Sequence, residues 1–299
     1  MDRRKFITLS AIGGAGLLAA RCAPSSPSQN SQNGNALLQL SSQENVAPGN
    51  SLTEKLDFLE EHGFTGLEPW GGGLENRVKE LQKALENRNI KVSAVVAGFR
   101  GFLIAKDPAM RQQAIDSIKI ILEAAGALGS TGLIVVPAFN NQETLPHFEA
   151  RALLVELLMD LGGHALRNNT RLLLEPLNRT EAWFLRMLAD AAAIAKNVGS
   201  EGVGVMGDFW HMTWEETCDM GAIFSAAPYL HHMHIASRKN RIMPGEDPGD
   251  DYTKGFKTLK HIGYKGYISL ECGSRGDLRE TIPAAAKLIR DQWEQASLC

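Results

Sequence analysis

The sequence has few cysteines, few aromatic residues and no excess of basic charge. Its four cysteines are too few and too widely spaced for a disulfide framework or a thiolate zinc site. Lysine and arginine number 31 against 34 aspartates and glutamates, a formal net charge of -3. A protein that binds nucleic acid is expected to carry a basic excess. We therefore predict no nucleic-acid partner.

Long hydrophobic runs are also scarce, and the one that approaches membrane character lies at the N-terminus. Residues 6–20 are apolar, too short to cross a bilayer comfortably, and preceded by Arg3 and Arg4. This pattern resembles a twin-arginine export signal, so we predict a signal peptide over residues 1–23 and an exported, periplasmic protein. Membrane attachment through a lipidated Cys22 stays open, because a large basic residue precedes that cysteine where lipoproteins have a small one.

The composition changes after the predicted signal peptide. Residues 24–35 are rich in serine, asparagine, glutamine and proline and have almost nothing to bury, so we predict a flexible linker. The chain as a whole is 44% hydrophobic and 22% charged, which is ordinary for a globular protein. We predict that residues 36–299 fold as one domain.

Short apolar runs alternate with longer amphipathic segments through this domain. Near-continuous apolar runs are typical of parallel strands buried on both faces, while stripes such as Ile115, Ile118 and Leu122 have helical spacing. Eight such runs, alternating with about eight helical segments, predict an α/β fold, the (β/α)8 TIM barrel. The predicted strands are residues 36–40, 66–68, 91–96, 132–136, 171–175, 202–206, 231–235 and 266–271.

An open, doubly wound sheet is the main structural alternative. Such a sheet needs a glycine-rich phosphate-binding turn after its first strand. Residues 40–44 read Leu-Ser-Ser-Gln-Glu and contain no glycine. This absence favours the closed barrel.

The last predicted strands finish in side chains that can bind a metal ion. Because they are about one strand–helix unit apart, we expect all of them at the C-terminal mouth of the barrel. Singly, each is readily explained as a helix cap, half of an ion pair or a structural histidine. Together, three carboxylates are costly to bury unless they are protonated or neutralised by a cation. We predict one divalent metal ion, Mn²⁺ first, with Mg²⁺, Co²⁺ or Zn²⁺ as alternatives. The four residues are Glu175, Asp208, His234 and Glu271.

These residues and their neighbours resemble the xylose isomerase-like TIM-barrel superfamily, and within it the sugar isomerases and ketose 3-epimerases. The resemblance extends in order over residues 36–299. It implies a metal-dependent sugar isomerase or epimerase, a small-molecule sugar as substrate, and the four residues above as metal ligands. The matching segments are residues 175–181 (Glu-Pro-Leu-Asn-Arg-Thr-Glu), residues 208–212 (Asp-Phe-Trp-His-Met), His234 and Glu271.

The same resemblance implies contacts with the substrate. Glu181 and His211 match positions that bind the sugar in the family. The epimerases have an arginine six residues after the histidine ligand, where this chain has Asn240, so Arg241 is the candidate one position later. The acidic loop 243–251 favours a neutral, non-phosphorylated sugar over an anionic one. The sequence leaves open whether the chain forms a homo-oligomer.

A metal at such a site acidifies the C–H beside a substrate carbonyl and stabilises the enediolate that forms when the proton leaves. Glu175 and Glu271 are the predicted catalytic residues, because they come from strands far apart around the barrel and can approach one carbon from two faces. Return of the proton to the same carbon gives an epimer. Return to the adjacent carbon gives aldose–ketose isomerisation, and loss of a β-hydroxyl gives a lyase.

Two further functions stay open on the sequence alone. One is a lyase or hydratase that acts on keto-sugars in the same barrel. The other is a non-catalytic, exported sugar-binding barrel that uses the metal for docking. An abasic-site DNA endonuclease, which has a related barrel, is disfavoured because Glu68 and Gly98 stand where it needs histidines.

Overall fold

The structure is a computed structural model that describes residues 36–297. The described residues all belong to one compact unit, Gln32–Cys299. The predicted signal peptide (1–23), with Cys22, and the predicted linker (24–35) lie outside the described residues. Among residues 36–297, no helix combines the length and the apolar character that crossing a membrane requires.

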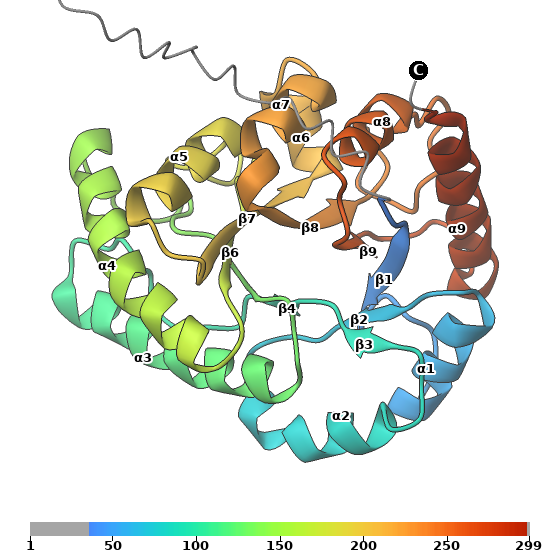
Figure 1. Ribbon diagram of the computed structural model, residues 1–299, viewed down its shortest axis with the longest axis horizontal. Helices are drawn as coiled ribbons and strands as arrows, with labels where there is room; N and C mark the ends of the chain where they lie inside the picture. The colour runs from blue at the N-terminus through green and yellow to red at the C-terminus, as the bar shows by residue number, and fades with distance from the viewer. Residues whose placement is uncertain (1–35, 298–299) are drawn as a thin grey trace, which may run out of the picture. The chain divides into compact units, whose positions relative to one another are not determined.

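Nine parallel strands form a nearly closed barrel, and the helices lie around it (Figure 1). The order around the sheet is β3-β2-β1-β9-β8-β7-β6-β5-β4, which confirms the predicted TIM barrel. The strands are β1 (Gln39–Gln43), β2 (Gly66–Glu68), β3 (Lys91–Val92), β4 (Val95–Val96), β5 (Leu133–Val135), β6 (Leu172–Leu174), β7 (Val203–Asp208), β8 (Leu230–Ile235) and β9 (Tyr267–Leu270).

Helices connect the successive strands except β3 and β4, as expected for repeated strand–helix units. Two further elements are short 3₁₀ helices, η1 (Leu74–Asn76) and η2 (Ala227–Tyr229). The α-helices are α1 (Leu52–Glu61), α2 (Val78–Ala84), α3 (Pro108–Ala127), α4 (His147–Arg167), α5 (Leu188–Val198), α6 (Phe209–Glu215), α7 (Asp219–Ala226), α8 (Thr253–His261) and α9 (Leu278–Gln295).

One predicted strand, residues 91–96, is divided into β3 and β4 by Ser93 and Ala94. β3 pairs with β2, whereas β4 pairs with β5, so this segment joins the two ends of the sheet. Trp70, just after β2, forms an additional bridge with Val96. The division therefore arises from barrel closure, because the first half of this segment pairs with β2 and the second half with β5.

The first strand lies three residues later than predicted. Its residues Ser41, Ser42 and Gln43 are polar but buried. Ser41 Oγ is 2.7 Å from Ser93 Oγ, so β1 and the residues between β3 and β4 share a hydrogen bond inside the barrel. A prediction from apolar runs does not anticipate such a polar strand. The shift is important for function because it places Gln43 at the C-terminal mouth.

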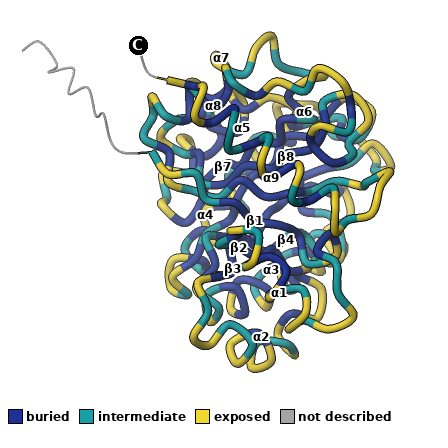
Figure 2. The backbone as a smooth tube through the Cα atoms, turned by 90° about the vertical axis from the view of Figure 1, so that its right-hand side faces the viewer, coloured by how far each residue is buried: buried dark blue, intermediate teal, exposed yellow. Residues whose placement is uncertain are grey.

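The barrel interior beneath the mouth is filled by side chains, apolar ones on the side of β4 to β7 and the serine pair Ser41–Ser93 near β1. Ile134, Leu173 and Met206 pack with Ala94 in a cluster separate from the main core. Alternate residues of the same strands, such as Leu172, point the other way and join the core under the helices. Figure 2 shows the strands mostly buried and the exposed residues concentrated in loops and outer helices. A barrel filled by side chains leaves the strand ends as the place for chemistry.

Candidate active site

Four side chains meet at the C-terminal ends of β6 to β9. We call Glu175, Asp208, His234 and Glu271 the carboxylate–histidine group; one ligand atom from each lies within 4.8 Å of the others. Glu175 and Glu271 directly follow β6 and β9, and Asp208 pairs with His234 in the register of β7 and β8. The structure thus brings together all four residues that were predicted to be metal ligands.

Two atoms of the group are buried without a hydrogen-bond partner among residues 36–297: Glu175 Oε1 and His234 Nδ1. His234 Nδ1 lies 2.9 Å from Glu271 Oε2 and 3.7 Å from Glu175 Oε1. Unpaired buried polar atoms are unfavourable unless something binds them. Carboxylates and one imidazole are ligands of hard to borderline divalent cations. The group therefore fits a divalent metal ion.

The two glutamates of the group differ in proton affinity. Burial raises the pKa of Glu175, and the charge of Glu271 adds to this effect while His234 opposes it. Burial also favours the neutral form of Glu271, but His234 and Arg241 outweigh it and lower its pKa to about 2. Acid–base pairs in enzymes commonly show such a difference.

Glu68, at the end of β2, supports the group from behind and was not among the predicted site residues. Both of its oxygens lie 3.0 Å from His234 Nε2, and Oε2 accepts a 2.7 Å hydrogen bond from His232 Nε2. Burial by itself raises the pKa of Glu68, but the two histidines outweigh burial and hold this pKa well below its usual range. Because His234 Nε2 faces Glu68, Nδ1 is the atom that faces the rest of the group.

Gln43, at the end of β1, is the second residue that the prediction missed. Its Nε2 donates to Glu68 Oε1 at 3.0 Å and to Glu271 Oε1 at 2.9 Å. Glu68 carried the same sequence signal as the predicted ligands, a carboxylate after an apolar run. Gln43 carried no such signal, because the first strand was predicted to end at residue 40, before Gln43.

His211 lies in the first turns of α6 and is buried. The backbone N–H of Asn178 donates to His211 Nδ1 at 3.1 Å. Because an N–H can only donate, Nδ1 carries no proton and the neutral ring has its hydrogen on Nε2. Nε2 has no hydrogen-bond partner among the described residues and lies 3.6 Å from Asp208 Oδ2. His211 is therefore an unused donor beside the carboxylate–histidine group.

Arg241 reaches the group although it stands one position later than the family's arginine. Its Nη2 lies 2.5 Å from Glu271 Oε2 and 3.3 Å from Asp208 Oδ2, and its guanidinium stacks 4.6 Å from the centre of the Trp210 ring. The φ of Arg241 is 53°, a left-handed conformation that is uncommon outside glycine. Asn240 instead donates to Asp247 at 2.7 Å.

Glu181 lies at the edge of the site. Its Oε1 accepts a 3.1 Å hydrogen bond from Asn178 Nδ2 and is 3.9 Å from Arg241 Nη1. The side chain is partly exposed. The structure therefore places all three predicted substrate-contact residues, Glu181, His211 and Arg241, around the carboxylate–histidine group.

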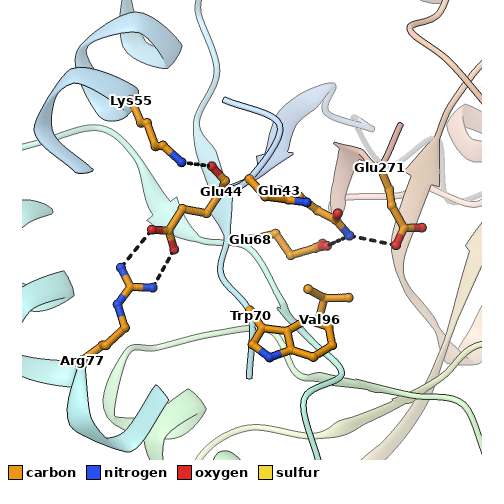
Figure 3. A pocket seen from close by; sticks show the side chains of 9 residues that line it. Gln43, Glu44, Lys55, Glu68, Trp70, Arg77, Val96 and Glu271 are labelled. Carbon is orange, nitrogen blue, oxygen red and sulfur yellow. Dashed lines mark hydrogen bonds and ion pairs between the residues drawn. The ribbon is translucent and has the colours of Figure 1, made fainter. Parts of the chain in front are cut away.

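A pocket of about 380 Å³ opens next to Glu271 and Glu68, on the side of β1 and β2 (Figure 3). We call it the side pocket. Trp70 lines it together with an ion pair in which Glu44 accepts two 2.9 Å hydrogen bonds from Arg77. The pocket connects the glutamates at the mouth to solvent.

The sequence matches known proteins over most of its length. A family model described as xylose isomerase-like TIM barrel matches residues 56–292. The 3-dehydro-D-guloside 4-epimerase of Escherichia coli (strain K12) is 31% identical over 245 residues, which is 79% of this chain and 91% of that protein. The D-psicose 3-epimerase of Agrobacterium fabrum is 37% identical over 117 residues, 39% of this chain and 40% of that enzyme.

Solved structures show the same architecture. The apo crystal structure of 3-keto-D-glucoside 4-epimerase from E. coli has a TM-score of 0.77 at 26% identity and covers 86% of this chain and 99% of its own. A crystal structure of D-psicose 3-epimerase in the presence of D-fructose has a TM-score of 0.76 at 20% identity, with 86% and 99% coverage. The similarity to this D-psicose 3-epimerase structure shows a shared fold only.

Proposed function

Because the chain belongs to the xylose isomerase-like TIM-barrel family, we propose that it is a divalent-metal-dependent sugar epimerase or isomerase acting on a neutral, non-phosphorylated sugar. The observation that carries the proposal is the convergence of the carboxylate–histidine group within 4.8 Å. Relatives that are sugar epimerases support the reaction class.

The carboxylate–histidine group would hold the metal ion, with Mn²⁺ as the first candidate. The chemistry that such an ion supplies when bound is polarisation of a substrate carbonyl, which acidifies the neighbouring C–H. Glu68 fixes the ring of His234 through Nε2 and so keeps Nδ1 turned toward the three carboxylates.

Glu175 and Glu271 transfer the proton of the carbon beside the carbonyl. They come from β6 and β9, so they approach a bound sugar from different sides. One removes the proton beside the carbonyl and the other delivers a proton to the opposite face, which inverts that carbon. Delivery to the adjacent carbon gives an isomer instead.

The remaining residues orient the sugar. His211 presents Nε2–H to a substrate oxygen, because its other nitrogen is occupied by Asn178. Arg241 donates to a second oxygen, and Glu181 accepts from a hydroxyl at the edge of the site. His211, Asp208 and His234 are 0–1% exposed, so these three side chains are withdrawn from bulk water.

Hydrogen exchange in D₂O tests this function. We expect the Mn²⁺-loaded protein to place deuterium next to the carbonyl of at least one sugar in a panel of neutral ketoses and 3-keto-sugars. Glu175→Gln and Glu271→Gln are expected to abolish the exchange while circular dichroism stays unchanged. An unsaturated product without an epimer would identify the lyase alternative. Sugar binding without any exchange would identify the non-catalytic barrel.

We also propose that the protein is exported, on the basis of Arg3 and Arg4 before the apolar residues 6–20. The wild-type chain is expected in the periplasmic fraction, and replacement of both arginines by lysine is expected to retain it in the cytoplasm. Labelling with a radioactive fatty acid, compared between the wild type and Cys22→Ala, decides whether Cys22 is lipidated.

A further inference from the structure

We propose that a second pocket, at the opposite end of the barrel from the carboxylate–histidine group, binds a phosphate group, either as free phosphate or as a small phosphate monoester. We call it the N-terminal pocket, because residues at the beginnings of β6, β8 and β9 line it. The proposal goes beyond the epimerase function, since these residues take no part in that reaction.

The N-terminal pocket has a volume of about 370 Å³ and lies where strands begin. Arg171 directly precedes β6, His231 is the second residue of β8, and Tyr267 is the first residue of β9. Along β6, Leu173 of the interior apolar cluster separates Arg171 from Glu175. Among the described residues, the N-terminal pocket and the side pocket have no lining residue in common. The two ends of the barrel therefore carry separate cavities.

Arg171 is a partly buried cation with an unused donor. Its Nε is buried and has no hydrogen-bond partner among residues 36–297. Burial lowers the pKa of Arg171, and the charge of Glu201 opposes this effect. A guanidinium nevertheless stays protonated in proteins. Its burial is unfavourable unless an anion or acceptor lies beside it. An arginine that served only to stabilise this end of the barrel would be expected to use all its buried donors within the protein.

The charged side chains of the N-terminal pocket have one sign. Lys265 lines the pocket together with Arg171, and its side chain is exposed. None of the lining residues in the described part of the chain is an aspartate or a glutamate. Arginine and lysine are the side chains that proteins use for phosphate. Two cations without a carboxylate between them favour a doubly charged phosphate over a singly charged carboxylate ligand.

The backbone at the start of β8 places a further donor at this pocket. β8 has an irregularity against β7, in which His231 is the extra residue of a bulge. A Cβ on residue 204 would lie 2.4 Å from Cδ2 of His231, so Gly204 on β7 leaves the space that the imidazole occupies. The neutral ring has one N–H to donate. The cavity is larger than a phosphate ion, which leaves room beside Ile262 and Tyr267 for a small organic group.

Titration calorimetry with inorganic phosphate, on the full chain dialysed free of metal ions and at constant ionic strength, tests the proposal. We expect saturable binding with a Kd of about 1 mM or lower. Arg171→Gln is expected to weaken it at least about tenfold and Lys265→Gln about threefold, because each removes a charge-assisted contact. Lys265 is exposed, so its variant keeps the fold even if Arg171→Gln does not. Lys79→Gln removes an exposed lysine of α2 outside the pocket and is expected to keep the wild-type Kd.

A wild-type chain without saturable phosphate binding would overturn the proposal. So would a Kd that is unchanged in both pocket variants, or one that Lys79→Gln weakens as much as Lys265→Gln, because binding would then lie elsewhere or be unspecific. Phenyl phosphate distinguishes the two forms of the ligand. Binding about tenfold tighter than that of inorganic phosphate supports a monoester, and equal binding supports free phosphate. None of these measurements depends on sugar turnover, so they stand or fall separately from the proposed function.

Discussion

Both carboxylate oxygens of Glu68 lie 3.0 Å from Nε2 of His234, on the side of the imidazole that faces away from the other three members of the carboxylate–histidine group. The contact joins β2 to β8 across the barrel. Outer hydrogen bonds of this kind orient a ligating histidine and raise its basicity. Glu68 is thus a positioning residue for the proposed metal site.

Glu68→Gln is expected to weaken Mn²⁺ binding by about 10- to 100-fold, because the amide keeps the volume but loses the charge and one acceptor. Titration calorimetry measures this Kd directly. Glu216→Gln, which changes a half-buried carboxylate outside the site, serves as the matched control and keeps the wild-type Kd. An unchanged Kd in Glu68→Gln would show that this contact does not support metal binding.

His211→Ala is expected to lower kcat/KM by roughly 100-fold, because it removes a buried hydrogen-bond donor aimed at a substrate oxygen. The Mn²⁺ affinity is expected to stay near the wild-type value, since His211 does not belong to the carboxylate–histidine group. Steady-state kinetics and calorimetry on the same preparation separate the two effects. Full activity of this variant would remove His211 from the proposed mechanism.

Arg241→Ala is expected to destabilise the metal-free protein and to increase the stabilisation by Mn²⁺. In the structure, Arg241 supplies the positive charge closest to Glu271 and Asp208. Without it, the buried Asp208 and the partly buried Glu271 lose a nearby positive charge until a cation binds. Thermal unfolding with and without Mn²⁺ measures both changes. Arg179→Ala, which removes an exposed guanidinium that pairs with Glu215, provides the control. A Mn²⁺ shift equal to that of the wild type would contradict the assigned contact.

His231 is expected to make the fold sensitive to acid. Burial, and then the charge of Arg171, lowers the pKa of His231 to about 4, against about 6.5 in the unfolded chain. Between these values the unfolded chain binds a proton that the folded chain does not, so stability falls as the pH drops from about 6.5 to 4. The loss amounts to roughly 2–3 kcal/mol at the acid end.

His231→Gln is expected to reduce this loss. Urea unfolding at pH 7.5 and at pH 4 gives the stability difference for each protein. The wild type is predicted to lose more stability than the variant between the two pH values. The same loss in both proteins would mean that another group causes the acid sensitivity.

The barrel and the four convergent residues could be predicted from the sequence, for a physical reason. Glu175, Asp208 and Glu271 each end an apolar run, and strand ends of a parallel barrel share one mouth. Gln43 was missed because β1 is polar inside the barrel, where Ser41 and Ser93 satisfy each other across strands. Such cross-strand pairing has no local signature.

The place of Arg241 could not be read from spacing either. It depends on a left-handed backbone conformation that puts Arg241, rather than Asn240, at the group. The division of residues 91–96 into two strands likewise follows from closure of the whole barrel. Both features are properties of the assembled fold, whereas the apolar runs are properties of each segment.

Anomalous X-ray scattering from crystals soaked in Mn²⁺ tests the central claim most directly. We predict a manganese peak enclosed by Glu175, Asp208, His234 and Glu271, with His234 coordinating through Nδ1. A fully soaked crystal with no peak between these four residues, or with manganese bound only elsewhere, would contradict the account.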